Sequence, residues 1–230
     1  MKLGLNKIIV TATVAIGLAS CATPPQTPIS FSQQSLSGPK EQIGVVSTKI
    51  PSVSVDFPGA DCLLCIGVAM AAHSTFREHA STLNAADLEN LQDELVAKLK
   101  ARGYRVARIT EAVDVRSLDS VSDKKDGFAK YNFAKYKKDG YTALVVTEYK
   151  SVGFRRGYQS YIPTEPMKAS LQGETYMVRI EDGKLLWFQP HNLSKGVVGE
   201  WDQPPKFPGL TNSYYSLLEE YKDIVLGSFK

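Results

Sequence analysis

The chain has 230 residues, 43% of them hydrophobic, and a formal net charge of +3 from 27 basic and 24 acidic side chains. This length and apolar content are sufficient for one folded core of ordinary size. The near balance of charge excludes an electrostatic case for nucleic-acid binding, which requires a clear excess of Lys and Arg.

Residues 1–20 have the pattern of a secretory signal peptide. Lys2 and Lys7 form a positive start, and residues 8–18 form an apolar run of eleven residues. A helix needs roughly 20 apolar residues to cross the hydrocarbon of a bilayer, so this run is a targeting signal rather than a membrane span. Removal of the signal leaves 25 basic against 24 acidic side chains.

The apolar run ends in Leu18-Ala19-Ser20-Cys21, which resembles the lipobox of bacterial lipoproteins. The resemblance implies cleavage before Cys21 and acylation of its thiol, and two or more acyl chains hold a protein at a membrane in effect permanently. Ala22, in place of Asp, implies sorting to the outer membrane, with the domain facing the periplasm. The alternative is an ordinary cleavage site with a chance cysteine.

The stretch after the cysteine is rich in Pro, Ser, Thr and Gln and has few large apolar side chains. Such a composition cannot bury enough surface to fold by itself. The sequence therefore predicts three parts: a signal peptide at 1–20, a lipidated amino terminus with a flexible tether at 21–40, and one domain at 41–230.

The first half of the domain predicts a strand, two helices and a second strand. Residues 43–55 carry β-branched apolar residues and indicate one strand or a bent pair of strand pieces. Residues 62–72 lack polar side chains and predict a buried helix. Residues 84–103 have a leucine stripe at helical spacing behind a capping pattern that starts at Asn84, and residues 104–109 indicate a strand.

The second half predicts a helix, several strands and a final helix. Residues 128–138 have a helical pattern, and residues 141–149 predict a central strand covered on both faces. Thr211 is the predicted cap of a last helix with one broad apolar face. Further strands are expected at 151–161, 168–180 and 184–189.

This order of elements predicts an α/β fold: a single domain with a mixed β-sheet, helices packed on it, and a closing helix at the carboxyl terminus. The order is similar to that of small periplasmic α/β lipoprotein domains, such as the curli secretion channel, the amino-terminal domain of TolB and the penicillin-binding-protein activator lipoproteins. A shared element order implies no activity.

Three stretches carry a closer resemblance, to a group of proteobacterial lipoproteins without an assigned activity. They are PGADCLLC at 58–65, RGY through YIPT at 156–164, and WD through FPGLTN at 201–212. The resemblance covers most of the mature domain. It implies the cellular location of the protein and no mechanism.

Cys62 and Cys65 form a C-x-x-C motif at the start of the predicted apolar helix. The first interpretation is a buried structural disulfide or a pair of buried thiols, because buried apolar cysteines are inert. The rival is thiol–disulfide exchange, since a helix start lowers a thiol pKa. A zinc site with His73 and His79 is disfavoured by the spacing, and His191 is expected in a solvated loop.

Arg155, Arg156, Tyr158 and Tyr161 crowd a predicted hairpin and form the candidate partner-binding surface. Arg and Tyr are enriched at binding hot spots because each combines a large contact area with polar ends. The alternative is an ordinary strand pair with a solvated face. Trp201 with the proline-rich loop at 204–208 is a second candidate surface, for which packing of the loop onto the domain is the stronger interpretation.

The sequence contains no nucleophile-elbow, Walker or Rossmann pattern. We therefore expect a noncatalytic accessory or assembly lipoprotein, without a cofactor or a metal, held at the membrane by its lipid anchor. Its expected partner is another envelope protein or a second copy of itself. The alternative is a thiol–disulfide exchange protein that uses Cys62 and Cys65.

Overall fold

One mixed sheet of six strands organises the domain. A computed structural model describes residues 25–32, 34, 36, 41–121 and 125–229, so Cys21 and the predicted signal peptide lie outside the described residues. The strands of the sheet are β1 (Gln42–Ser47), β2 (Ser54–Asp56), β3 (Arg105–Arg108), β4 (Ala143–Arg155), β7 (Lys168–Arg179) and β8 (Leu185–Lys195). Five of them have the order β3-β1-β4-β7-β8, and β2 pairs with β4 outside this order. The predicted mixed α/β class is confirmed.

The long strand β4 connects the two ends of the molecule. β1 pairs in parallel with its first half and β2 with its last three residues, so the expected bent pair of strand pieces is confirmed. A bulge between Tyr149 and Ser151 lets one strand replace the two that were predicted on either side of residue 150. Residues Ala143, Leu144, Val145 and Val146 are 0% exposed, as expected of a central strand.

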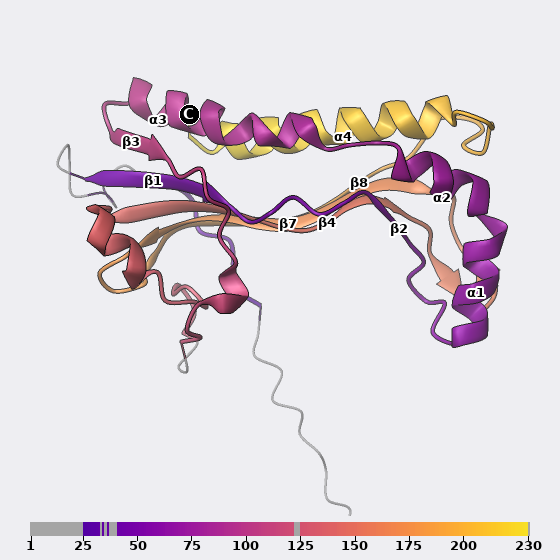
Figure 1. The fold of residues 1–230 in the computed structure, drawn as a ribbon, viewed down its shortest axis with the longest axis horizontal. Coiled ribbons are helices and arrows are strands. Elements are labelled where there is room, and N and C mark those ends of the chain that lie inside the picture. The colour runs from indigo at the N-terminus through magenta and orange to yellow at the C-terminus, as the bar shows by residue number, and fades with distance from the viewer. Residues whose placement is uncertain (1–24, 33, 35, 37–40, 122–124, 230) are drawn as a thin grey trace, which may run out of the picture.

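Helices α3 (Leu91–Ala101) and α4 (Pro208–Gly227) cover one face of the sheet, which is the upper face in Figure 1. The leucine stripe predicted for α3 lies in the larger of two hydrophobic clusters, against the apolar face of α4. The predicted start of α3 was too early, because a 3-10 turn at Ala86–Glu89 precedes it. The predicted cap at Thr211 was wrong: α4 begins at Pro208, and the Thr211 hydroxyl donates to the Lys206 carbonyl (3.1 Å).

The lower face is covered by chain with little regular structure, residues 113–121 and 125–136, around a second hydrophobic cluster. The helix predicted at 128–138 was wrong, and a 3-10 helix forms at Ala134–Asp139 instead. Earlier in this segment, Phe128 makes a β-bridge with Lys184, and the Ala129 N–H donates to the Gly183 carbonyl (2.8 Å). These strand-like hydrogen bonds take the place of the helical ones.

The first described residues, 25–29, also lie on the lower face (Figure 1), and Phe31 reaches the cluster on the other face. Ile29 forms an antiparallel bridge with Phe188 of β8, and Phe31 packs on Phe229 with ring centroids 4.9 Å apart. The Gln26 side chain accepts a hydrogen bond from Gly127 N–H (2.8 Å). Part of the segment that was expected to be a free tether is therefore packed on the domain, because it contains a few apolar side chains after all.

At the far end of the sheet, α1 (Leu63–Ala72) and α2 (Ser74–Ser81) connect β2 to the upper layer. A small hairpin of β5 (Tyr158–Gln159) and β6 (Ile162–Pro163) lies at the same end. Figure 1 shows α1 extending from α2 past the end of the sheet toward the lower side. Within the described residues, every helix is too short or too polar to cross a bilayer.

Candidate functional site

The three stretches that carry the lipoprotein resemblance meet at the α1 end of the molecule. Tyr158 N–H donates to the Pro58 carbonyl (2.8 Å), and the Tyr158 hydroxyl lies 2.8 Å from Nε2 of His73. The Arg156 guanidinium lies over the Trp201 ring, 4.8 Å from its centroid. We call Phe57, His73, Arg156, Tyr158 and Trp201 the terminal cluster.

Cys62 and Cys65 are joined by a disulfide at the start of α1. Cys62 is the residue that caps the helix, and its sulfur accepts a hydrogen bond from Cys65 N–H (2.9 Å). Cys65 is 2% exposed, and its sulfur lies 3.4 Å from the hydroxyl of Ser160 in the hairpin turn. The disulfide therefore fixes the first turn of α1 beside the hairpin.

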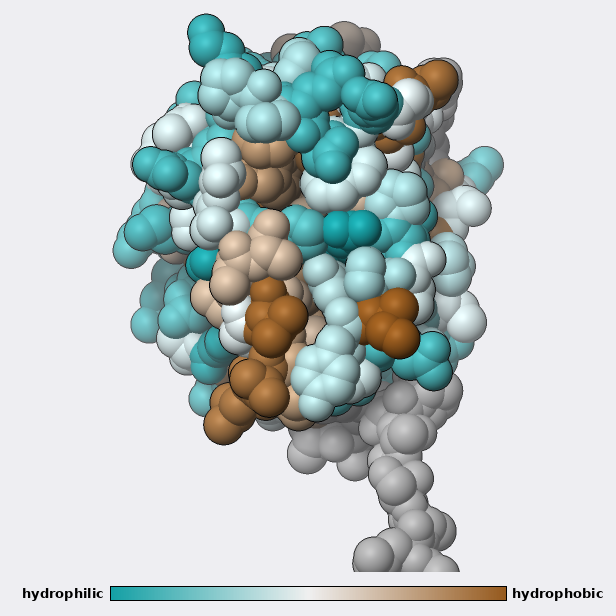
Figure 2. Space-filling model, turned by 90° about the vertical axis from the view of Figure 1, so that its right-hand side faces the viewer, coloured by the Kyte–Doolittle hydropathy of each residue, from teal (hydrophilic) through white to brown (hydrophobic). Residues whose placement is uncertain are grey.

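The helix that follows the disulfide is exposed, so the prediction of a buried helix was wrong. Leu63 is 92% exposed and Leu64 67%, and three further apolar side chains of α1 are also exposed. Figure 2 shows the apolar side chains gathered in the lower half of this end of the molecule. We call the exposed side chains of α1 the apolar tip, which consists of Leu63, Leu64, Ile66, Val68 and Met70.

The cause of this exposure is the position of α1 beyond the end of the sheet. Its buried side chains are Cys65 and Ala69, which face the rest of the domain. Tyr161 and Ile162 of the hairpin add two more exposed apolar groups beside the tip. An exposed apolar patch of this kind on a folded domain is typical of an interaction site.

The four residues of the predicted partner-binding surface do not share one environment. Tyr161 is exposed, whereas Arg155, Arg156 and Tyr158 are half-buried. Arg156 donates from Nε to the Glu165 carbonyl (2.9 Å) and lies 3.1 Å from His73 through Nη1. Arg156 and Tyr158 thus hold the hairpin against the rest of the domain.

The contacts of His73 determine its protonation state. Because a guanidinium can only donate, Nε2 of His73 accepts from Arg156, which places the imidazole proton on Nδ1. Burial lowers the pKa of His73 and the charge of Arg156 lowers it further, which agrees with a neutral ring. His79 bonds instead to the Thr211 hydroxyl (2.9 Å). Among the described residues, no group of three His, Cys, Asp or Glu side chains is placed to bind a metal ion.

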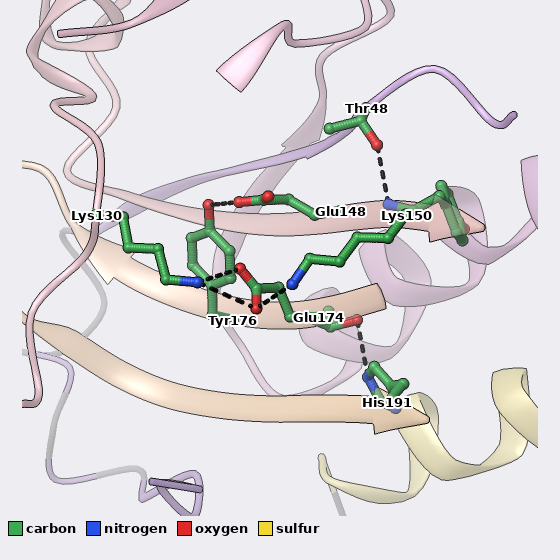
Figure 3. Close-up of polar contacts among 9 residues, drawn as sticks. Thr48, Lys130, Glu148, Lys150, Glu174, Tyr176 and His191 are labelled. Atoms are coloured by element: carbon green, nitrogen blue, oxygen red, sulfur yellow. Dashed lines mark hydrogen bonds and ion pairs between the residues drawn. The ribbon is translucent and has the colours of Figure 1, made fainter. Parts of the chain in front are cut away.

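A second candidate region is a cavity of about 250 Å³ on the lower face of the sheet. Phe128, Leu185 and Phe188 form its apolar wall, and the first described residues of the chain close one side. Charged groups from β4, β7 and the covering segment meet at its base (Figure 3). We call Lys130, Glu148, Lys150, Glu174 and Tyr176 the polar cluster.

Two glutamates of the polar cluster have opposite electrostatic environments. Burial tends to raise the pKa of Glu174, but the hydrogen bond from Lys150 (2.9 Å) and the charge of Lys130 (3.1 Å) bring it below the ordinary value. Burial raises the pKa of Glu148, the hydrogen bond from the Tyr176 hydroxyl opposes this, and the charge of Glu174 adds to it. Glu174 is therefore the ionised partner, and Glu148 is the group that takes up a proton more readily.

His191 lies on the opposite face of the sheet from this cluster, against Tyr221 of α4, and not in a solvated loop, so that prediction was wrong. It belongs to β8, is 5% exposed, and lies 3.1 Å through Nε2 from the Thr175 hydroxyl. The Thr175 hydroxyl also lies 3.1 Å from the hydroxyl of Tyr221 on α4. Burial lowers the pKa of His191 to about 4, so the ring is neutral in ordinary conditions.

The polar cluster was missed by sequence reasoning, although a signal was present. Glu148 and Glu174 are charged residues inside segments predicted as strands, and charges that become buried need partners or a shifted pKa. A cavity with apolar walls and a few convergent polar groups can receive a small ligand. The arrangement offers a carboxyl of raised pKa at Glu148 and an ammonium at Lys130.

No protein-family model and no curated protein matches the chain. Several solved structures, including the following three, have a distantly similar shape. The PelC dodecamer of Paraburkholderia phytofirmans is 11% identical, with 88% of this chain and 94% of that chain covered and a TM-score of 0.35. Lipoprotein GNA1162 of Neisseria meningitidis is 14% identical, with 81% and 96% covered and a TM-score of 0.34.

The third structure is a putative neuraminyllactose-binding hemagglutinin homolog from Helicobacter pylori, with 7% identity and a TM-score of 0.41. It covers 83% of this chain, and the same share of its own chain is covered. At these scores the similarity identifies neither a family nor an activity for this chain.

Proposed function

We propose that this protein is a membrane-anchored envelope lipoprotein that acts as a noncatalytic accessory or assembly protein. Acyl chains on Cys21 hold it at the outer membrane, and the domain faces the periplasm. It binds another envelope component, or its own copies, through the apolar tip of α1. The observation that carries this proposal is the exposure of Leu63 and Leu64 on a helix fastened by a disulfide.

The surroundings of the tip support a binding role because they hold it in one conformation. The disulfide fixes the first turn of α1, and Ser160 N–H of the hairpin donates to the Gly59 carbonyl (3.0 Å). Arg156 anchors the hairpin to Trp201 and His73. A surface that is ordered before binding loses less conformational entropy when the partner arrives.

The anchor is tested by the native amino terminus. We expect mass spectrometry of the protein extracted from cells to show a chain that begins at an acylated Cys21. The variant Cys21→Ser should lose the acyl chains and leave the outer-membrane fraction. A native chain that begins upstream of Cys21, or that carries no lipid, contradicts the proposal.

The binding surface is tested by photo-cross-linking in intact cells. A photoreactive residue replaces Leu64 in one variant and Lys100, an exposed residue of α3, in the matched control. We expect adducts with protein or lipid at position 64 and few at position 100. Absence of adducts at position 64, or equal yields at the two positions, contradicts a binding role for the tip.

A second candidate function is thiol–disulfide exchange. It is favoured by one observation: Cys62 is partly exposed and caps the amino terminus of α1, where the helix dipole stabilises a thiolate. Cys65, in contrast, is buried. The two functions differ in whether the pair cycles between its oxidised and reduced forms.

A further inference from the structure

The apolar tip is unusual in how much of the helix circumference it occupies. At 100° per residue, Leu63, Leu64, Ile66, Val68 and Met70 spread over an arc of about 200°. A helix that packs on a protein core or partner usually buries an apolar stripe about 100° wide or slightly wider. The sequence of α1 also contains no charged residue from Leu63 to Ala72.

The direction in which α1 extends is the second observation. The described chain begins at Pro25, on the face of the sheet opposite α3 and α4. In Figure 1 both this start and α1 lie on the lower side of the molecule. The end of α1 that follows β2 is its lower end in this view, so the helix begins with Leu63 at the side where the described chain begins.

The short chain between Cys21 and Pro25 limits how far the lower side of the domain can lie from the membrane. Cys21 precedes Pro25 by four residues, which reach at most about 14 Å when fully extended. Pro25 itself is followed by Gln26, Thr27 and Ile29, which contact the domain. An acylated Cys21 would thus keep the lower side of the domain close to the lipid surface.

We infer that the amino-terminal end of α1 enters the lipid surface of the same membrane that carries the anchor, so that lipid is what covers the apolar tip. This inference rests on the proposed function, because acylation of Cys21 supplies the membrane. The tip adds a second point of attachment and fixes the orientation of the domain above the bilayer.

Lipid fits the chemistry of the tip better than a protein partner does. Acyl chains surround a projecting helix from all sides, which matches the wide apolar arc. A protein partner would cover one side and leave part of the arc in water. Because α1 itself has no charged side chain, its insertion does not depend on attraction to charged headgroups.

The test uses the full, lipidated chain reconstituted in vesicles of phosphatidylethanolamine and phosphatidylglycerol that contain brominated phosphatidylcholine. Tryptophan is introduced as Leu64→Trp, and as Lys100→Trp on the opposite side for the matched control. The unsubstituted chain gives the background from Trp187 and Trp201. We expect bromine to quench roughly half of the added fluorescence at position 64 and almost none at position 100, as for a group seated about 5–10 Å into the boundary.

Leu63→Asp in the Leu64→Trp background serves as a second variant, since a charge at the tip should remove the quenching while the anchor remains. Equal quenching at positions 64 and 100, or none at 64, overturns the lipid inference. If position 64 is unquenched but still forms cross-links to a protein or to a second copy in cells, the inference fails and the proposed binding function stands. If both signals are absent, both fail.

Discussion

Glu148 of β4 and Glu174 of β7 lie directly opposite each other in the antiparallel register. Two like charges at such positions destabilise a sheet. The structure resolves the conflict in two ways, because Lys130 and Lys150 both pair with Glu174, and the Tyr176 hydroxyl bonds to Glu148. The pair should therefore control how the stability of the domain depends on pH.

Glu148→Gln should make the domain more stable near neutral pH. The folded pKa of Glu148 lies above its ordinary value of 4.5, so its contribution to stability is complete below that value and is lost as pH rises through the folded pKa. Glutamine keeps an acceptor for Tyr176 and does not ionise. Urea unfolding should show a gap in unfolding free energy between variant and native protein that widens as pH rises from the ordinary value of 4.5 toward neutral. A gap that stays constant across this range would disprove the assignment.

Glu174→Gln should have the opposite dependence. Lysine partners lower the pKa of Glu174, so its contribution is present above the ordinary value and is lost as pH falls through the folded pKa. We expect a loss of about 1–2 kcal/mol near neutral pH, because water partly compensates the half-exposed lysines. The loss should shrink in acid. Glu181→Gln, at an exposed turn, is the control and should change stability by less than about 0.5 kcal/mol.

Gly59→Ala should disturb the hairpin next to α1. Gly59 has a φ of +86°, and a Cβ there would lie 1.9 Å from the Tyr158 carbonyl oxygen. Gly183 has a similar φ of +73° but no atom within 4 Å of such a Cβ, so Gly183→Ala isolates the backbone strain of about 1–2 kcal/mol. Gly59→Ala should cost a further 1–3 kcal/mol, roughly the effect of overpacking. Equal unfolding free energies for the two variants would show that the hairpin adapts without cost.

Replacing both Cys62 and Cys65 by Ser should weaken the domain without unfolding it. The disulfide closes a loop of four residues, for which chain entropy gives about 2 kcal/mol, and a serine can still cap the helix. Chemical denaturation measures this loss. Thiol trapping in cells, with the double variant as the unlabelled control, should find the native pair oxidised throughout. A pair that is partly reduced and changes with the redox state of the medium would favour the exchange function.

The sequence was sufficient to predict those helices and strands whose local pattern of apolar residues indicates both their type and their burial. The leucines of α3 recur at helical spacing, and the continuous apolar run from Ala143 to Val146 is short and rich in valine, as is typical of a strand covered on both faces. The register of Glu148 against Glu174 was not accessible, because it depends on how β4 and β7 align across the sheet. The local sequence around a residue does not indicate which residue of another strand will lie next to it.

The sequence predicted which residues belong to the candidate site but not which of them are exposed. The sequence singled out the cysteine pair and the arginine-tyrosine stretch, and the structure brings both to one end. The exposure of α1 could not be predicted, because a buried helix and an exposed apolar helix can have the same amino-acid composition. The role of Arg156 was ambiguous for a similar reason: an arginine can bind a partner or hold a hairpin within the domain, and here it does the second.

The bridge between Ile29 and Phe188 has a consequence for self-association. β8 is the last strand of the sheet, and an open strand of this kind offers its free N–H and C=O groups to other chains. Ile29 occupies those of Phe188, with an N–H to O distance of 2.9 Å in one direction and 3.0 Å in the other. A chain shortened to begin at Glu41 would uncover this position, and recombinant protein made that way should be prone to aggregate through strand pairing.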